Sequence, residues 1–233
     1  MGRGSVAGQE GGAGRRGRPP RHTSADVVAA AVAIADAHGL AAVTMRTVAA
    51  RVGAGAMSLY SYVPDKETLV AAMVEHVSGE QRLPGTPSGD WRADLAAVAR
   101  EQRALLHRHP WVVEALSHRQ PLGPHALAVL EFAAAALEPT GQPPATRLET
   151  FALLTGFVIN VVRSELADAA AAPATSDPAQ AQQRQLIELL ATGRYPHVAA
   201  AFADAAGGGR VPDVGERFEH LLARMLDGLV GRS

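Results

Sequence analysis

Apolar residues recur at helical spacing along most of this 233-residue chain, and no stretch shows the sustained alternation of a β-strand. The first periodic stretch follows Ser24, a residue type that favours helix N-caps, and its inward stripe includes Val27 and Ile34. It ends at His38-Gly39, because glycine permits the left-handed backbone of a helix end. The pattern predicts an all-α fold.

Turns that contain glycine or proline divide the rest of the pattern into further helices. We expect these helices at residues 45–52, 56–62, 66–78, 91–107, 110–117, 124–137, 146–166, 179–191, 196–205 and 214–229. Changes in composition mark three regions: a Gly- and Arg-rich stretch over 1–22 that we predict to be disordered, a small helical domain over 23–79, and a larger one over 90–233. The residues between the two domains hold several glycines and prolines, as linkers do.

The stretch TMRTVAARVGAGAMSLYSYVPDKETL, residues 44–69, reads as two short helices joined by a glycine turn. Thr44 is suited to cap the first helix, and Gly53 to end it. Pro64 closes the second helix, and Asp65 caps the next one. This arrangement lays one helix in the major groove of DNA, so we predict a helix-turn-helix.

The same residues resemble the DNA-binding domain of TetR-family transcriptional regulators. The match lies in Thr44, Val48-Ala49, Val52-Gly53, Ser58-Leu59-Tyr60, Val63-Pro64-Asp65-Lys66-Glu67 and Leu69, and it extends upstream to Thr23. Further along, HPWVVEAL, PLGPHAL and RYPHVAAAF are similar to the ligand-binding half of the tetracycline-repressor branch. The resemblance implies a three-helix DNA-binding domain followed by a helical ligand-binding and dimerisation domain. The expected function is a homodimeric, ligand-responsive repressor that an apolar small-molecule effector releases from its double-stranded DNA operator.

Charge is distributed unevenly along the chain. The net charge is −1, which alone does not favour a nucleic-acid partner. Residues 1–66 nevertheless hold 8 Arg or Lys against 4 Asp or Glu, whereas the remainder holds 14 against 19. A basic N-terminal third on an acidic body is the asymmetry expected when one end meets phosphate.

Few side chains of the helix-turn-helix have the chemistry to contact DNA. Lys66, the single lysine, starts a helix and matches the family position that holds a phosphate; a solvated lysine is the alternative. Arg46 can grip guanine, or lie near phosphate only, and Tyr60 can meet the backbone or be buried in the small core. The full predicted set is Thr44, Met45, Arg46, Gly55, Ala56, Met57, Ser58, Tyr60, Ser61, Tyr62 and Lys66.

The N-terminal stretch carries its own candidate contact. An RGRP run resembles the core of minor-groove AT-hook segments, and a flexible basic arm can enter that groove beside a docked helix. A solvated tail is the alternative. The arginines concerned are Arg15, Arg16, Arg18 and Arg21.

The middle helices are predicted to enclose an effector pocket with an apolar lining and a few polar groups that orient the ligand. Each histidine has a structural role as its alternative, and Arg163 is equally suited to a salt bridge across a dimer. The predicted lining is Leu105, His107, Trp111, His118, Leu130, Phe132, Leu153, Phe157, Asn160 and Arg163.

Two strongly apolar helices, 146–166 and 214–229, are the candidates for a homodimer interface, with intrachain core as the alternative. In the family the corresponding pair forms a four-helix bundle between subunits. The predicted interface residues are Phe151, Thr155, Ile159, Val162, Phe218, Leu221, Leu222, Met225 and Leu229.

Several classes of function are disfavoured by what the sequence lacks. There is no cysteine and no GxSxG, HExxH or phosphate-cradling loop, so we expect neither an enzyme nor a cofactor. No metal site is predicted: Ala115 and Leu116 stand where the tetracycline repressor has its metal-binding histidine. The longest strongly apolar run, 150–162, is too short for a membrane span, which indicates a cytoplasmic protein. Activation of transcription, and an architectural or co-regulatory DNA-binding role without a ligand, remain as alternatives.

Overall fold

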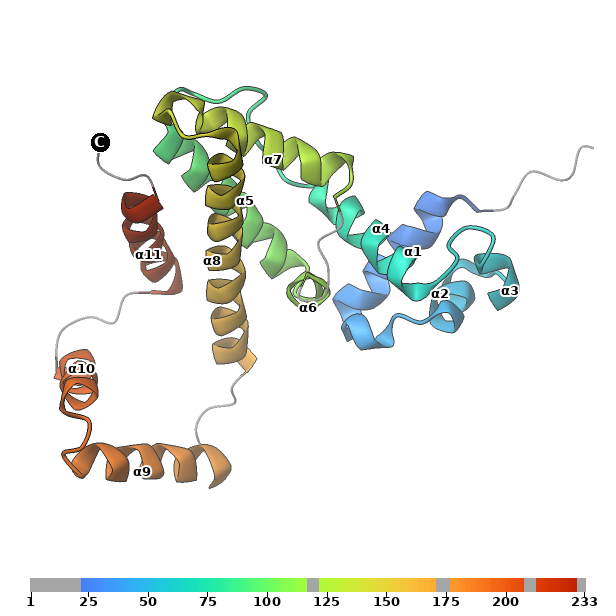
Figure 1. Cartoon of the computed structure of the whole chain (residues 1–233). Helices are drawn as coiled ribbons and strands as arrows, with labels where there is room; N and C mark the ends of the chain where they lie inside the picture. The colour runs from blue at the N-terminus through green and yellow to red at the C-terminus, as the bar shows by residue number, and fades with distance from the viewer. Residues whose placement is uncertain (1–21, 117–121, 171–176, 208–212, 230–233) are drawn as a thin grey trace, which may run out of the picture.

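The computed structural model describes residues 22–116, 122–170, 177–207 and 213–229. Every regular element in these residues is helical, as the periodicity predicted (Figure 1). The elements are α1 (Ser24–His38), η1 (Leu40–Ala42), α2 (Met45–Val52), α3 (Ala56–Leu59), α4 (Lys66–Ser78), α5 (Trp91–Arg108), α6 (Trp111–Ala115), α7 (Pro124–Ala136), η2 (Glu138–Thr140), α8 (Pro144–Ala170), α9 (Asp177–Ala191), α10 (Pro196–Gly207) and α11 (Val214–Leu229).

The first four helices form a compact unit at one end of the molecule (Figure 1). Helix α1 packs on both α2 and α4, and α2 packs on α3. Their shared core contains Val27, Val48, Leu59 and Leu69, none of which is accessible to solvent. Together these side chains remove a continuous apolar surface from water, which is the main force that holds such a small unit together.

The ends of several helices differ from the prediction, and two of them, in α1 and α3, have a clear local cause. Thr23, not Ser24, caps α1: its hydroxyl accepts from the backbone N–H of Asp26 and the Asp26 carboxylate accepts in return, in a capping box. Helix α3 ends at Leu59 rather than at residue 62, because the backbone N–H groups of Tyr62 and Val63 both donate to the carbonyl of Leu59 and close a turn there.

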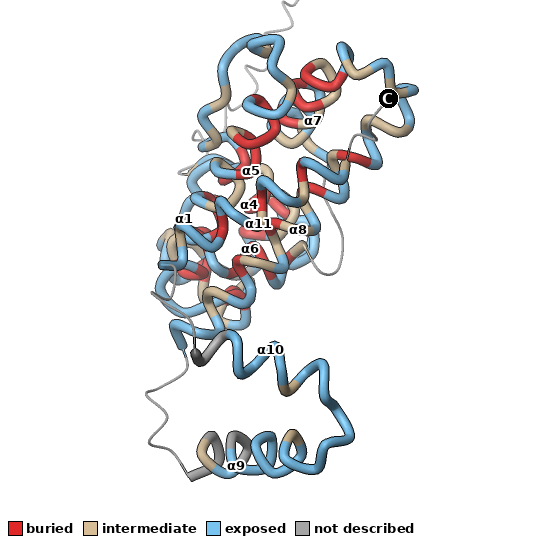
Figure 2. Tube along the Cα trace, turned by 90° about the vertical axis from the view of Figure 1, so that its left-hand side faces the viewer, coloured by how far each residue is buried: buried red, intermediate tan, exposed pale blue. Residues whose placement is uncertain are grey.

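The C-terminal body is built around α5, α7 and α8, and α11 lies against α5 and α8. Figure 2 shows the buried positions concentrated where these helices meet, whereas α9 and α10 are exposed along most of their length. Helices α9 and α10 pack mainly on each other and extend away from the body (Figure 1). Helix α8 is longer than predicted at both ends.

Helix α8 also meets, by length and composition alone, the requirements for crossing a membrane. The sequence analysis missed this because it counted only the strongly apolar run at 150–162. In the fold, α8 packs on α5 and α7, and about a quarter of its apolar window is buried within the chain (28%). Its apolar character therefore has two uses within a helical body: an inner face for the core and an outer face that this chain leaves uncovered.

Candidate DNA-binding surface and effector cavity

Backbone geometry at the glycine turn fixes the angle between α2 and α3. Thr44 caps α2 by accepting from the backbone N–H of Thr47, as predicted. Gly53 ends the helix with φ 69°, a left-handed conformation that a side chain would make costly. The backbone N–H of Ala54 donates to the carbonyl of Ala49, which closes the turn. The helix-turn-helix geometry thus follows from a capping threonine and one glycine.

Helix α3 has one anchored side and one open side. Leu59 is fully buried against the domain core, whereas Met57 is 83% exposed. A single exposed apolar side chain is ordinary on a protein surface, so Met57 is notable only because it lies on the helix that the fold presents beside the turn. Tyr60, 48% exposed, lies in the turn that follows.

The other predicted DNA contacts lie at or near this surface. Ser58, Ser61, Gly55, Arg46 and Lys66 are exposed. Met45 and Tyr62 are half-buried against the core, and the exposed Thr44 uses its hydroxyl in the capping box. The Ser61 hydroxyl donates to the carbonyl of Ser58 at 2.6 Å.

Five predicted DNA contacts cannot be placed, and one exposed cation was missed. The side chain of Ala56 and the arm arginines at 15, 16, 18 and 21 lie outside the described residues. Arg51, exposed in the last turn of α2, was not singled out. Its signal was present in the sequence, since a basic residue at a helix end next to the turn is an obvious phosphate ligand.

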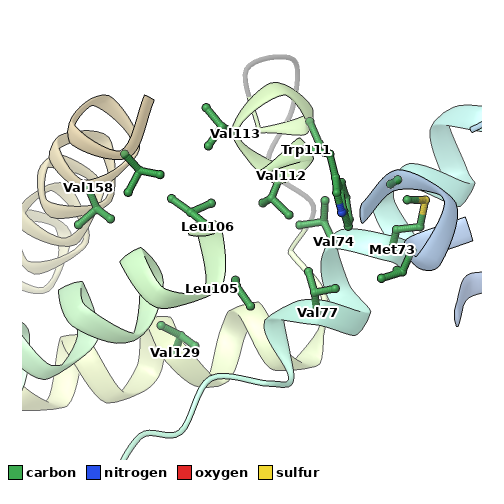
Figure 3. Close-up of a cluster of buried hydrophobic side chains, with 14 of the residues drawn as sticks. Met73, Val74, Val77, Leu105, Leu106, Trp111, Val112, Val113, Val129 and Val158 are labelled. Carbon is green, nitrogen blue, oxygen red and sulfur yellow. The ribbon is translucent and has the colours of Figure 1, made fainter. Parts of the chain in front are cut away.

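A partly open cavity of about 230 Å³ lies where α4 of the first unit meets α5 to α8 of the C-terminal body. In Figure 3, Val74 of α4, Leu105 and Leu106 of α5, Val112 of α6 and Val129 of α7 converge from their separate helices. Among the described residues, no charged side chain lines it. The lining residues are Val74, Ser78, Gln81, Gln102, Leu105, Leu106, Val112, Leu116, Leu122, Ala126, Val129, Leu130, Leu148, Phe151, Ala152, Thr155 and Ile159.

Only part of the predicted pocket lines this cavity. Leu105 and Leu130 do, and Phe132 lines a neighbouring cavity of about 560 Å³ between α7 and the loop that follows α4. His118 lies outside the described residues.

The other predicted pocket residues, on α5, α6 and α8, do not line this cavity, because they lie on faces of their helices that point elsewhere. The Trp111 indole N–H donates to Asp36 of α1, and His107 contacts Glu165 at 2.6 Å. Phe157 stacks near Phe218, with ring centroids 6.1 Å apart. Leu153, Asn160 and Arg163 lie on the exposed side of α8.

The predicted dimer residues of α8 face inward. Phe151, Thr155 and Ile159, one turn apart, form the α8 wall of the cavity. Val162, Phe218 and Leu222 are buried by their own chain, so they stabilise the fold and cannot contact a partner directly. Leu221, Met225 and Leu229 of α11 are half-buried. Periodicity showed that these helices are apolar, but it could not show which side the rest of the chain covers.

Two carboxylates of the α4 segment tie it to the body. Glu75 accepts from the backbone N–H groups of His125 and Ala126, and so it caps α7, whose own N-cap residue Gly123 has no side chain. A Cβ on Gly123 would come within 2.2 Å of the Glu75 carboxylate, so a larger residue there would displace this side chain from its capping position. Beyond the end of α4, Glu80 contacts His109 and Arg108 of the body.

His109 connects the body to both α1 and the end of α4. Its Nδ1 lies 2.8 Å from Asp36 of α1 and its Nε2 lies 3.1 Å from Glu80, and the ring is nearly buried. Each ring nitrogen of His109 thus faces a carboxylate, one from α1 and one from the segment after α4. Burial alone would raise the pKa of Glu80, but hydrogen bonds and charge from His109 and Arg108 outweigh it and hold that pKa below its usual value.

The sequence analysis did not predict this junction, because its partners are 73 and 29 residues away from His109 in the chain. Among the described residues no group of three or more His, Cys, Asp or Glu side chains is arranged to hold a metal ion.

The fold and these surfaces define a helix-turn-helix regulator. Its DNA-binding unit, formed by α1 to α4 and called the reading unit below, is joined to a helical body that borders a cavity. Comparison with known proteins is consistent with this class. The family model for bacterial regulatory proteins of the tetR family matches residues 27–73, and that for the tetracyclin repressor-like C-terminal domain matches residues 83–232.

Individual relatives cover nearly the whole chain. The HTH-type transcriptional repressor DrrR1 of Streptomyces coeruleorubidus is 39% identical over 219 residues, 92% of this chain and 79% of that protein. The apo structure of ActR from Streptomyces coelicolor matches with a TM-score of 0.73 at 25% identity, over 91% of this chain and 97% of ActR. ActR in complex with actinorhodin matches with a TM-score of 0.67 at 24% identity, over 89% and 96%, which shows the fold alone.

The chain therefore belongs to the TetR family of bacterial regulatory proteins, and it is a DNA-binding regulator of transcription.

Proposed function

We propose that this regulator is a repressor that binds its operator as a homodimer and leaves it when an uncharged, largely apolar molecule enters the 230 Å³ cavity. The observation that carries the proposal is the position of α4. Lys66, at its first residue, lies beside the helix-turn-helix, and Val74 and Ser78, near its other end, form part of the cavity wall. One rigid helix thus connects the two sites, so a ligand that displaces one end moves the other.

The chemistry of the cavity defines the class of effector. The described part of its wall is aliphatic and aromatic with a few neutral polar groups, and a charged ligand would lose its hydration there without gaining a partner from these residues. The DrrR1 relative is named a transcriptional repressor, and the ActR fold has been solved in complex with actinorhodin. Both support repression that is controlled by a small molecule.

A homodimer is supported by the outer faces of α8 and α11. Leu153 of α8 is 62% exposed, and the exposed Gly156 beside it would allow a close approach by a second helix. One helix-turn-helix buries too little surface for operator affinity, and a dimer places two of them on half-sites roughly 34–36 Å apart. We therefore move the proposed interface from the inner residues of these helices to their exposed faces.

On the DNA side, we propose that Lys66 binds a phosphate, that Arg46 reads a base edge, and that Met57 packs on a thymine methyl group. All three side chains are exposed on the same unit. Minor-groove binding by the N-terminal arm remains a prediction, as do the domain limits at residues 79 and 90. A repressor acts where the DNA is, so we expect it in the cytoplasm.

The proposal is tested with a fluorescent DNA fragment taken from beside the protein's own coding sequence. We expect salt-sensitive binding by anisotropy, a dimer by analytical ultracentrifugation, and release on addition of an effector found in a metabolite screen. Ala126→Phe, which fills the cavity, should keep DNA affinity and lose release. Leu127→Phe, an exposed position on the same helix, is the matched control and should keep both.

Release that persists in Ala126→Phe would place the effector elsewhere. DNA binding that no small molecule alters would favour an architectural or co-regulatory role without a ligand.

A further inference from the structure

One carboxylate joins two of the helices that form the wall of the 230 Å³ cavity. Glu75 of α4 accepts from the backbone N–H groups of His125 at 2.6 Å and of Ala126 at 3.4 Å, and it lies 2.9 Å from the Nδ1 of His125. Ala126 itself lines the cavity, as does Val74, the residue before Glu75. The contact between α4 and α7 therefore lies directly beside the cavity.

The first turn of α7 depends on this carboxylate for its hydrogen bonds. A helix begins with N–H groups that have no acceptor within the helix and need one from outside. At the start of α7, Pro124 has no N–H, and Gly123 has no side chain that could act as a cap. Glu75 supplies the acceptor for both remaining N–H groups, those of His125 and Ala126, and its negative charge suits a helix N-terminus.

This contact differs in kind from the apolar packing around the cavity. Hydrophobic contacts are non-directional, so apolar side chains can slide past one another when the cavity fills. Hydrogen bonds keep their strength only within a narrow range of distance and angle, so Glu75 follows the first turn of α7 when that turn moves. Lys66 begins the same helix, about 14 Å along its axis from Glu75. A movement of α7 at the cavity thus reaches the end of α4 that lies beside the helix-turn-helix.

We propose that Glu75 is a positioning residue that couples the first turn of α7 to the reading unit, so that the two change position together. The inference rests on the proposed function, because that function requires the cavity and the DNA-binding surface to communicate. It assigns the communication to one hydrogen-bonded contact rather than to the apolar wall as a whole. Coupling between two sites is reciprocal, so operator DNA that fixes α4 also steadies the first turn of α7 when no effector is present.

Gly123 makes it possible to separate a coupling role of Glu75 from a purely structural one. Glu75→Ala removes both the cap of α7 and its connection to α4. The atoms nearest to a Cβ on Gly123 all belong to Glu75, so a serine at this position has room once Glu75 is truncated. The extended backbone of Gly123 is that of an N-cap, and a serine there can accept from the first-turn N–H groups. The double variant Glu75→Ala/Gly123→Ser therefore caps α7 again without joining it to α4.

The first measurement is hydrogen exchange by mass spectrometry on the full chain, with and without the DNA fragment from beside its own coding sequence. In the wild type, DNA should slow exchange in peptides that cover residues 122–130 by about fivefold or more. In Glu75→Ala and in the double variant, the change should be less than about twofold. Gly123→Ser alone displaces Glu75 and should lose the effect as well.

Thermal stability identifies the structural part of the effect. Tm should fall by about 2–4 °C in Glu75→Ala, which leaves α7 without a cap, and recover in the double variant. Glu131→Ala is the matched control, because it removes the same charge from an exposed position in the middle of α7. It should keep both the wild-type Tm and the effect of DNA on residues 122–130.

The second measurement is release of the DNA fragment by 2-naphthol, an uncharged and largely apolar probe. The ratio of the Kd values for DNA with and without saturating probe should fall by about fivefold or more in both variants that lack Glu75.

The outcomes separate this inference from the proposed function. Recovery of the coupling together with Tm in the double variant would show that Glu75 is only a cap, and it overturns the inference. Release of the wild type and of both variants alike also overturns it and leaves the proposed function intact. If DNA steadies residues 122–130 only when Glu75 is present, but the probe does not release the wild type, the inference is supported and the result counts against the proposed derepression.

Discussion

The two ends of α4 belong to regions that are packed in different ways. Around α1 to α3, side chains such as Val27, Val48 and Leu59 are completely buried and the turn is fixed by Gly53. In the C-terminal body the helices leave two cavities between them, and apolar side chains such as Leu153, Ile187 and Phe202 are exposed on α8, α9 and α10.

The difference follows from what each region meets. A DNA groove has nearly constant dimensions, so a unit that reads it benefits from a filled core that keeps its helices at one angle. A body that accepts an effector and a second subunit must keep space and uncovered apolar surface for both. The electrostatic ties through Glu75, Glu80 and His109 lie between the two regions and couple them.

The largest effect is expected from the packed region. Leu59→Ala opens a cavity in a tightly packed core, and it should lower the free energy of unfolding by about 2–5 kcal/mol. Urea denaturation followed by circular dichroism measures this change.

Met57→Ala is the matched control two residues away. It should change stability by less than about 0.5 kcal/mol, because the side chain is exposed, and yet weaken operator binding. If the two variants were equally destabilised, the division of α3 into an anchored and an open side would be wrong.

Local sequence signals were sufficient to predict most of the reading unit. A threonine cap, a turn glycine and a proline each act within a few residues, so the order Thr44, Gly53 and Pro64 predicted the helix-turn-helix. The error at Thr23 was of the same local kind: two adjacent hydroxyl residues can both cap a helix, and only Thr23 has Asp26 at the right spacing for a capping box.

The next effect concerns the junction between the regions. His109→Ala removes the ring that joins Asp36 and Glu80, and it should cost about 1–3 kcal/mol of stability and weaken effector-induced release more than DNA affinity itself. His107→Ala is the control, because its contact with Glu165 ties α5 to α8 within the body. Equal loss of release in both variants would show that the junction has no special role in coupling.

At the DNA surface, Arg46→Ala should cost about 1–3 kcal/mol of operator affinity and relax the preference at one base position, as measured by selection from random sequences. Arg51→Ala removes the same charge from the other end of α2. It should weaken binding to all sequences alike and reduce the salt dependence. A selected sequence that is unchanged in Arg46→Ala would rule out a base contact by this residue.

The effector site was harder to predict than the reading unit. Periodicity identified the apolar helix over residues 146–166, but Phe151 and Phe157 are equally apolar, and only the placement of α7 and α11 decides that the first lines the cavity and the second packs on Phe218. The contact between Gln102 and Thr155 could likewise not be predicted, because the two residues are 53 positions apart in the chain. Long-range packing, rather than local pattern, defines this region.

The smallest expected effect depends on pH and acts at the junction. Hydrogen bonds and charge from His109 and Arg108 outweigh burial and lower the pKa of Glu80 below its ordinary 4.5. The stabilisation by Glu80 is therefore complete above pH 4.5 and is lost as the pH falls through the lowered folded-state pKa. Because the side chain is 41% exposed, we expect this contribution to the free energy of unfolding to be only about 0.2–1 kcal/mol.

Glu80→Gln should remove that part of the acid sensitivity in urea titrations between pH 3 and 6, a range of roughly 1.5 units on either side of the ordinary value. Glu149→Gln is the control: this exposed residue of α8 makes no ion pair within the described part of the chain, so its substitution should leave the pH profile unchanged. If both variants shifted the profile equally, the effect would reflect total charge rather than the contact between the reading unit and the body.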